Sequence, residues 1–147
     1  MKYIIMYVVG LLFLGCSHKT TPVIVAFKKD NFVINDQGFL KEDSFSKKIE
    51  VYNVGQLVFV LTIKNRYICI NKKCYDKGLF IYQINPNYPK NLLSLIIDKK
   101  PLPNLKIEKT DNGFFQKTTH FLYVVTDKKV FFRDKSKNFL FLLKKNR

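Results

Sequence analysis

The chain has 147 residues, enough for one domain with a hydrophobic core and too few for two. It is strongly basic, since 26 Lys and Arg outnumber 11 Asp and Glu and give a formal charge of +15. Such a charge suggests nucleic-acid binding where basic residues cluster. Here the basic doublets are spread between apolar runs along the whole chain, so we expect no nucleic-acid partner. We interpret them either as solvated turns and edge-protecting lysines or as residues attracted to anionic lipid head groups. The doublets are Lys28-Lys29, Lys47-Lys48, Lys72-Lys73, Lys99-Lys100, Lys128-Lys129 and Lys144-Lys145.

The first sixteen residues have the order of an export signal. One positive charge at Lys2 precedes an apolar run over residues 3–14, and the small Gly15 stands before Cys16. The run is too short to span a membrane, which takes about 20 apolar residues, and polar residues begin at Ser17. Export is a second argument against a nucleic-acid partner.

The ending Phe13-Leu14-Gly15-Cys16 resembles the lipobox of bacterial lipoproteins. The resemblance implies that residues 1–15 are removed and that Cys16 carries diacylglycerol and an N-acyl chain such as palmitate, with no other cofactor. Several acyl chains make such an anchor effectively permanent. Ser17, where an Asp would favour inner-membrane retention, implies the outer membrane. The alternative is an ordinary signal peptide in which the cysteine is coincidental.

Removal of this signal would leave 132 residues with a formal charge of +14, because 25 of the Lys and Arg and all 11 acidic residues follow residue 15. We expect residues 16–22 to form a short polar tether. Residues 23–147 are expected to form a single β-rich domain in the periplasm.

Apolar and β-branched runs separated by turn residues predict antiparallel strands in the first half of this domain. Residues 35–38, Asn-Asp-Gln-Gly, are expected to form a turn, and residues 41–48 a charged loop. The best hairpin candidate joins two runs through Asn53-Val54-Gly55-Gln56. The expected strands cover residues 23–27, 32–34, 49–52 and 57–63.

The strand expected over residues 57–63 is apolar on both faces. Val58, Val60 and Thr62 share one face, and the opposite face is formed by Leu57, Phe59, Leu61 and Ile63. A strand of this kind is either covered on both sides or lines an apolar hollow.

Cys69 and Cys74 face each other if Asn71-Lys72 is a two-residue turn. In that register they form a pair with Cα atoms about 4.5 Å apart, within reach of a disulfide. Because Asn-Lys lacks the glycine that such turns prefer, the alternative is a longer turn with a skewed pairing. An oxidising export compartment permits the bond. A zinc site is the rival interpretation, but the only histidines, His18 and His120, have no recognised ligand spacing, so we expect no metal.

Residues 85–89, Asn-Pro-Asn-Tyr-Pro, predict the start of one short helix that Pro101 and Pro103 end. Its apolar stripe would lie on a sheet; the stripe consists of Leu92, Leu93, Ile96 and Ile97. The remaining residues predict a meander of short antiparallel strands, which makes the fold mainly β with a minor α component. These strands are expected over residues 105–109, 114–125, 129–133 and 139–143.

This order of elements is similar to the second part of the LolB family, outer-membrane receptors that accept lipoproteins from a periplasmic carrier. The likeness covers residues 48–146 and is carried by Asn53-Val54-Gly55 between two strands, by the helix before Pro101 and by residues 113–116, Gly-Phe-Phe-Gln. It implies a curved half-barrel with the helix on its concave face, around a hollow for acyl chains. The residues in position to line that hollow are Leu57, Phe59, Leu61, Leu92 and Ile96. Val54 would insert into the bilayer; alternatively, it is an ordinary turn residue.

The resemblance implies a lipid-anchored outer-membrane protein that binds acyl chains or lipidated clients without covalent chemistry. We find no nucleophile and base pair and expect no catalytic residue and no enzyme activity. The alternative function is a structural lipoprotein that braces an envelope assembly complex through a sheet edge and needs no lipid hollow. Its partners would be envelope assembly proteins rather than a lipoprotein carrier.

Overall fold

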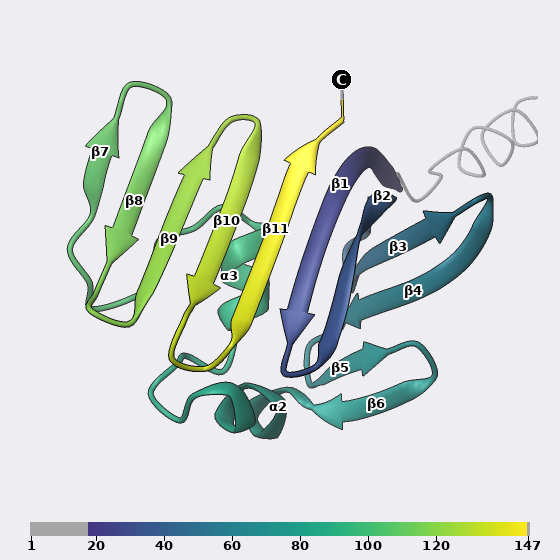
Figure 1. Ribbon diagram of the computed structural model, residues 1–147, viewed down its shortest axis with the longest axis horizontal. Coiled ribbons are helices and arrows are strands. Elements are labelled where there is room, and N and C mark those ends of the chain that lie inside the picture. Colours follow the sequence, from purple (N-terminus) through teal and green to yellow (C-terminus); the bar gives the residue numbers. More distant parts are fainter. Residues whose placement is uncertain (1–17, 147) are drawn as a thin grey trace, which may run out of the picture.

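The computed structural model describes residues 18–146, and eleven strands of this part form one antiparallel sheet (Figure 1). The strand order is β6-β5-β4-β3-β2-β1-β11-β10-β9-β8-β7, so β6 and β7 are the edges of an open, curved sheet. This confirms the predicted fold class. The strands are β1 (Lys19–Lys29), β2 (Phe32–Glu42), β3 (Lys47–Asn53), β4 (Gln56–Ile63), β5 (Tyr67–Ile70), β6 (Lys73–Asp76), β7 (Glu108–Thr110), β8 (Gly113–Lys117), β9 (Phe121–Thr126), β10 (Lys129–Asp134) and β11 (Phe139–Lys145).

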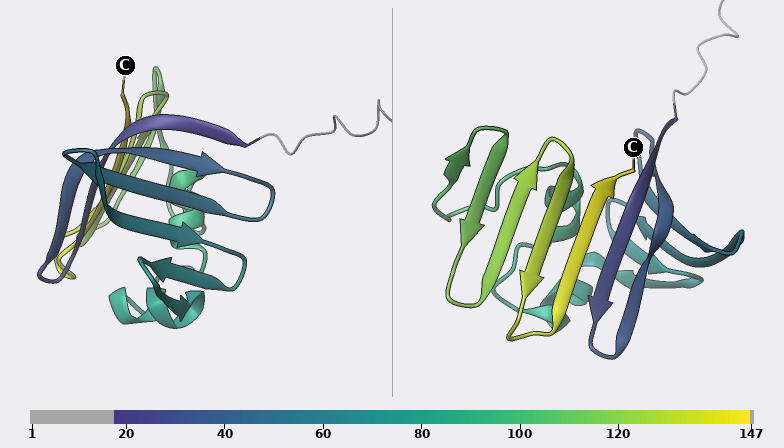
Figure 2. Two further views of the ribbon diagram at one scale, coloured as in Figure 1. Left: turned by 90° about the vertical axis from the view of Figure 1, so that its right-hand side faces the viewer. Right: turned by 45° about the horizontal axis from the view of Figure 1, so that its top comes forward.

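Within residues 18–146, two short helices lie on the concave side of the sheet, where one was predicted (Figure 2). The predicted helix is α3 (Leu92–Ile97), and the four residues of its apolar stripe are all buried. The additional helix is α2 (Lys77–Ile84), which begins after Asp76, whose carboxylate accepts a hydrogen bond from the Leu79 amide at 3.0 Å. An aspartate N-cap is a known helix-start signal, so Asp76 is the residue from which α2 could have been predicted. Within the described residues, no helix is long and apolar enough to cross a membrane.

The N-terminal half of the sheet is more continuous than predicted. Residues 19–22, expected in the tether, belong to β1, and residues 35–38, expected to form a turn, lie inside β2. Gly38 is required for close strand packing rather than for a turn, because a Cβ atom there would collide with the Glu50 carbonyl oxygen of β3. The expected charged loop shrinks to residues 43–46, since both flanking strands extend into it.

The C-terminal meander has one more strand than predicted. Residues 114–125 form β8 and β9 rather than one long strand, with a tight turn between them. In this turn the Thr118 hydroxyl accepts hydrogen bonds from the amides of His120 and Phe121, each at 3.2 Å. A threonine that bonds its own backbone can end a strand without glycine or proline.

A β-bulge changes the predicted face of one residue in β4. Phe59 pairs with Val51, but Leu57 pairs with Tyr52, so the register shifts between these two pairs. Leu57 therefore leaves the face of Phe59, Leu61 and Ile63 and is 50% exposed, which corrects its predicted place on the apolar face. The other three side chains are buried as expected.

Candidate functional site

Four of the five side chains expected to line an apolar hollow are part of the core. Phe59, Leu61, Leu92 and Ile96 are each 0% exposed and belong to one cluster between the sheet and the helices. The fifth candidate, Leu57, points to the opposite face. In this state of the protein, the four buried side chains fill the space between sheet and helices.

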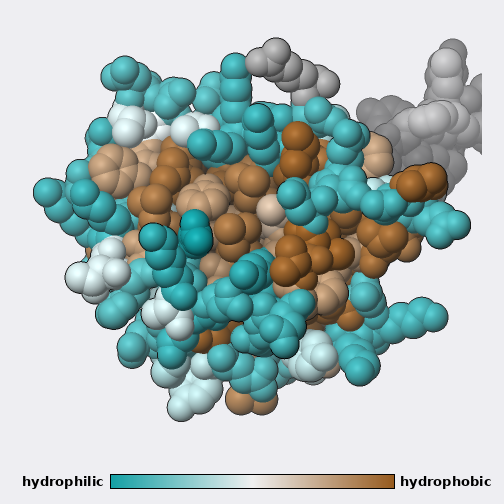
Figure 3. Space-filling view, in the orientation of Figure 1, coloured by the Kyte–Doolittle hydropathy of each residue, from teal (hydrophilic) through white to brown (hydrophobic). Residues whose placement is uncertain are grey.

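The convex face of β8, β9, β10 and β11 carries a second apolar surface, here called the outer apolar face. One row of cross-strand neighbours runs across it through the pairs Phe115 with Val124, Val124 with Phe131, and Phe131 with Leu142. The face consists of Phe115, Leu122, Val124, Phe131, Leu140 and Leu142, all partly or largely exposed. The helices α2 and α3 lie on the other side of the sheet. Figure 3 shows hydrophobic side chains gathered across this face with hydrophilic ones around them.

The outer apolar face has a basic rim. The same strand faces carry Lys117, Lys129, Arg133 and Lys144, and β1 adds Lys28 opposite Leu140. The ammonium group of Lys117 lies 5.6 Å from the centre of the Phe115 ring, a cation–π contact. On this rim the strands contribute one carboxylate, Glu108, which pairs with Phe115 at the edge of the sheet. The face therefore combines apolar side chains with positive charge.

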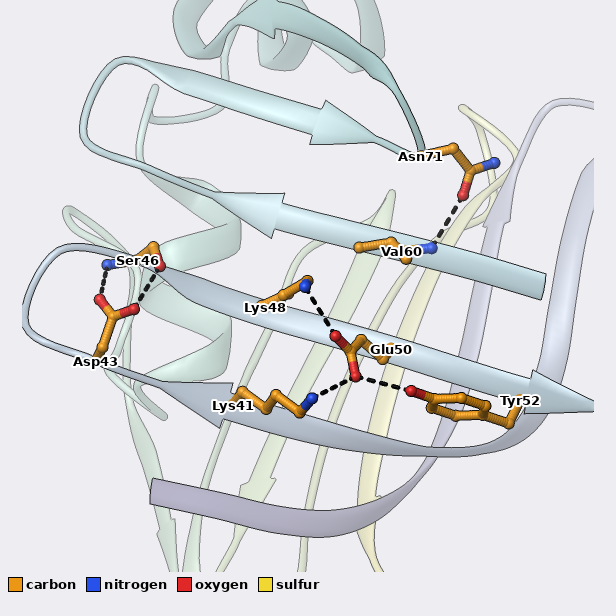
Figure 4. A network of polar contacts seen from close by, with 8 residues as sticks. All are labelled: Lys41, Asp43, Ser46, Lys48, Glu50, Tyr52, Val60 and Asn71. Atoms are coloured by element: carbon orange, nitrogen blue, oxygen red, sulfur yellow. Dashed lines mark hydrogen bonds and ion pairs between the residues drawn. The ribbon is translucent and has the colours of Figure 1, made fainter. Parts of the chain in front are cut away.

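The start of β1 and the turn between β2 and β3 lie side by side, and we call this region the anchor side. Lys19 pairs with Glu42, which places His18 next to Asp43 at the beginning of the turn. Asp43 fixes the turn by accepting hydrogen bonds from the amides of Phe45 at 2.7 Å and Ser46 at 2.6 Å. Figure 4 shows the Asp43–Ser46 contact. These bonds lower the pKa of Asp43. The fixed turn presents the Phe45 side chain, which is 90% exposed.

A pocket of about 310 Å³ opens on the anchor side between the ends of β1, β2, β10 and β11 and the end of α3. We call it the lysine-lined pocket because four lysines surround it: Lys19, Lys99, Lys128 and Lys145. Its apolar lining is formed by Val23, Leu40, Ile97, Val130 and Leu143, all of which are buried. The pocket thus pairs cationic walls with an apolar floor.

The two carboxylates of the lysine-lined pocket share one cationic partner. Both Glu42 and Asp98 are ion-paired with Lys47. Within residues 18–146, none of the four pocket lysines has an ion-pair partner. The Lys99 ammonium donates to the carbonyl oxygens of Thr126 at 2.8 Å and Asp127 at 2.7 Å, which fixes it in the wall.

Burial and neighbouring charge both act on Lys99. Burial lowers the pKa of Lys99, and the positive charge of Lys145 lowers it further, outweighing the opposite effect of Asp127. The four lysines of the pocket outnumber its two carboxylates, which both contact Lys47. An anion placed there would relieve the repulsion between the lysines.

Glu50 forms the other notable charged cluster, on the outer face of β3. Its carboxylate accepts from Lys41 at 2.6 Å, Lys48 at 2.8 Å and the Tyr52 hydroxyl at 3.0 Å (Figure 4). These contacts lower the pKa of Glu50 to about 2, with the bond from Lys41 the largest cause. Lys48 and Tyr52 belong to β3 itself, and Lys41 belongs to β2. The Lys41 contact therefore ties β2 to β3, and the carboxylate is fully paired rather than free.

Two further buried polar side chains are structural. The Gln116 amide donates to the carbonyl oxygens of Leu102 at 3.0 Å and Leu105 at 3.2 Å and accepts from the Leu102 amide at 2.7 Å, which fixes the Pro-rich loop before β7. Burial alone would raise the pKa of Asp134, but hydrogen bonds from Tyr88, Ser136 and Lys137 lower it. The described residues contain no group of three or more His, Cys, Asp or Glu that could hold a metal ion.

Cys69 and Cys74 occupy the predicted register. They pair directly across the β5–β6 hairpin, with Asn71-Lys72 as the turn and Cα atoms 3.9 Å apart. Their Sγ atoms lie 1.98 Å apart, at disulfide distance. Asn71 also connects this turn to β4, because its side-chain oxygen accepts a hydrogen bond from the Val60 amide at 3.0 Å (Figure 4).

Val54 lies at the tip of the β3–β4 hairpin, as predicted, and is 97% exposed. Both central residues of this turn have positive φ, 48° at Val54 and 75° at Gly55. The turn lines a shallow hollow with Phe39 and Tyr52 of the convex face. Cys16, the predicted lipidation site, lies outside the described residues.

Comparison with models of protein families and with curated proteins finds no match to this chain. The candidate functional surfaces of the protein are the outer apolar face and the lysine-lined pocket. Sequence reasoning missed both of them. In the sequence of β8 to β11, both alternating faces of the strands carry apolar residues. On one of these faces Lys and Arg stand between the apolar residues, and this mixture could have predicted a face that other elements leave uncovered.

Proposed function

We propose that this protein is a lipid-anchored adaptor of the cell envelope, held at the outer membrane through Cys16 and bound through its outer apolar face to an acidic protein partner. The observation that supports it most is the row of apolar side chains across β8 to β11 that no helix of the described chain covers. Contiguous exposed apolar surface rimmed by polar groups marks interaction sites. This proposal is a form of the alternative function above, a structural lipoprotein that braces an envelope assembly complex. Here the protein would bind its partner through a face of the sheet instead of an edge.

The geometry favours a protein over the bilayer as the occupant of this face. From Cys16 to His18 the chain can reach roughly 7 Å, two residues of extended backbone, so a lipidated Cys16 would hold the anchor side at the membrane. In the left panel of Figure 2, β1 begins on the right of the molecule and β8 to β11 form its left side, with their convex face turned away from α3. The outer apolar face then points away from the membrane.

The charge of the rim favours an acidic partner over a second copy of this chain. Two copies docked face to face would oppose Lys28, Lys117 and Arg133 with the same cationic rim, and like charges across an interface are unfavourable. An acidic surface on the partner would form favourable contacts with the basic rim, and its affinity would fall as the salt concentration increases.

Photocrosslinking in growing cells tests this function. A photoreactive amino acid at Phe131 or Leu142 should give the same single protein adduct, and Arg133→Glu should reduce its yield several-fold. Tyr82, which is 64% exposed on α2, provides the matched control position and should not give this adduct. The purified partner should bind less tightly at high salt. Adducts formed mainly with phospholipid, or equally at Tyr82, would contradict the proposal.

Transfer of lipidated clients, as the LolB resemblance implies, is the second candidate. The apolar floor of the lysine-lined pocket beside the anchor side favours it, although four of the five residues expected to line the hollow are buried. If Val54 inserts into the bilayer during transfer, Val54→Asp should impair lipoprotein sorting without loss of folding. Normal sorting in that variant would remove this candidate.

A further inference from the structure

The lysine-lined pocket is a second candidate binding site, separate from the outer apolar face. Its walls come from four places in the chain: Lys19 begins β1, Lys99 follows α3, Lys128 precedes β10 and Lys145 ends β11. The fold thus gathers positive charge from distant segments into one opening. The two carboxylates in its wall are both held by Lys47.

We propose that this pocket binds the phosphate head group of an anionic membrane lipid, with the apolar floor against the first carbons of its acyl chains. Lysine ammonium groups bind phosphate as compact point charges. The Ile97 and Leu143 side chains of the floor suit the hydrocarbon next to the head group and not a fully hydrated ion. The binding step is non-covalent.

The location of the pocket fits a lipid ligand. Lys19 is three residues from Cys16, so extended chain allows about 10 Å between them. A lipidated Cys16 would bring the pocket to the level of the lipid head groups. The orientation of the pocket toward the membrane rests on the proposed lipid anchor at Cys16. Binding of the head group does not require a protein partner on the outer apolar face.

Phe45 supports the same orientation from an independent element. Its turn lies beside the start of β1, and its side chain is 90% exposed while the Asp43 carboxylate holds the backbone in place. An exposed aromatic ring next to a cationic pocket suits the boundary between head groups and acyl chains.

Native mass spectrometry of the full-length protein, extracted from membranes in a neutral detergent, tests the pocket. We expect phosphatidylglycerol to bind at one site, and phosphatidylcholine at least tenfold more weakly. The triple variant Lys19→Gln, Lys128→Gln, Lys145→Gln should lose at least tenfold in affinity for phosphatidylglycerol. Lys99 stays unchanged because it holds Thr126 and Asp127.

The matched control is the triple variant Lys72→Gln, Lys73→Gln, Lys109→Gln, which removes the same charge from exposed positions outside the pocket. It should bind like the natural protein. Equal loss in both variants, or equal binding of phosphatidylcholine, would overturn the head-group site. Inorganic phosphate that binds as tightly as the lipid would overturn the lipid assignment.

The same spectra keep this proposal separate from the proposed anchoring. The mass of the intact chain shows whether Cys16 carries lipid, whereas the titration shows whether the pocket binds the head group. A lipidated protein without head-group binding refutes the pocket alone.

Discussion

The two faces of β8 to β11 are built from the same kinds of residues and have different surroundings. On the concave face, Tyr123, Phe132 and Phe141 are 0% exposed and pack in the core beneath the helices. One residue further along two of these strands, Val124 and Leu142 remain partly exposed on the convex face. Hydrophobic residue type therefore does not identify the core of this protein. The helices and the curvature of the sheet decide which face is covered.

Polar residues mark the same difference. On the concave face, Gln116 and Asp134 are completely buried and have hydrogen-bond partners at every described polar atom. On the convex face, Lys117 and Arg133 are exposed among apolar neighbours. A buried polar group must be satisfied inside the protein, whereas an exposed cation can remain in water until a partner arrives.

The largest expected effect comes from neighbouring phenylalanines on opposite faces. Phe132→Ala should lower the free energy of unfolding by about 3–5 kcal/mol, the usual cost of a large core cavity. Phe131→Ala should cost about 1 kcal/mol or less, because its ring remains partly in water. Urea unfolding of the detergent-extracted protein measures both. Equal losses would show that the convex face is covered by something other than the described chain.

The charged cluster on β3 should give an effect of intermediate size. The Glu50 carboxylate, with its pKa lowered from 4.5 to about 2, stabilises the fold above pH 4.5, and this contribution is lost as the pH falls toward 2. We expect a loss on the order of 2 kcal/mol across that window, which thermal unfolding at stepped pH would measure.

Glu50→Gln should remove most of this pH dependence, since the amide does not titrate. The matched control is Glu108→Gln on the convex face, which forms no ion pair within residues 18–146. An unchanged pH profile in Glu50→Gln would contradict the assigned role of the Lys41 and Lys48 contacts.

The smallest expected effect is a gain in stability at an exposed turn. Val54 has a φ of 48°, a region that costs a β-branched residue about 1–2 kcal/mol. Val54→Asn should therefore stabilise the protein by about 1 kcal/mol, because Asn-Gly suits this two-residue turn. Val33→Asn, at a 59% exposed position within β2, is the control and should not stabilise. A loss of stability in Val54→Asn would show that the turn is not strained.

Local patterns in the sequence predicted much of the fold. The Asn71-Lys72 turn set the Cys69–Cys74 register because a two-residue hairpin leaves little freedom, and the proline-bounded helix appeared where its apolar stripe indicated. The errors arose where a distant contact decided the outcome. Gly38 was predicted to be part of a turn, but the structure shows that it makes room for the close approach of β3. The bulge that turns Leu57 outward depends on the pairing of β3 with β4, which the sequence of β4 alone does not reveal.

By itself, the sequence determined a mainly β domain, the register of the Cys69–Cys74 hairpin and the proline-bounded helix, because alternation, turn chemistry and proline act over a few residues. Only the tertiary structure decided the candidate sites. It assigned four of the five predicted hollow residues to the core by laying α2 and α3 over one face of the sheet, and it left the other face uncovered. It also brought together Lys19, Lys99, Lys128 and Lys145, because strand order and curvature, not sequence distance, determine which side chains share a pocket.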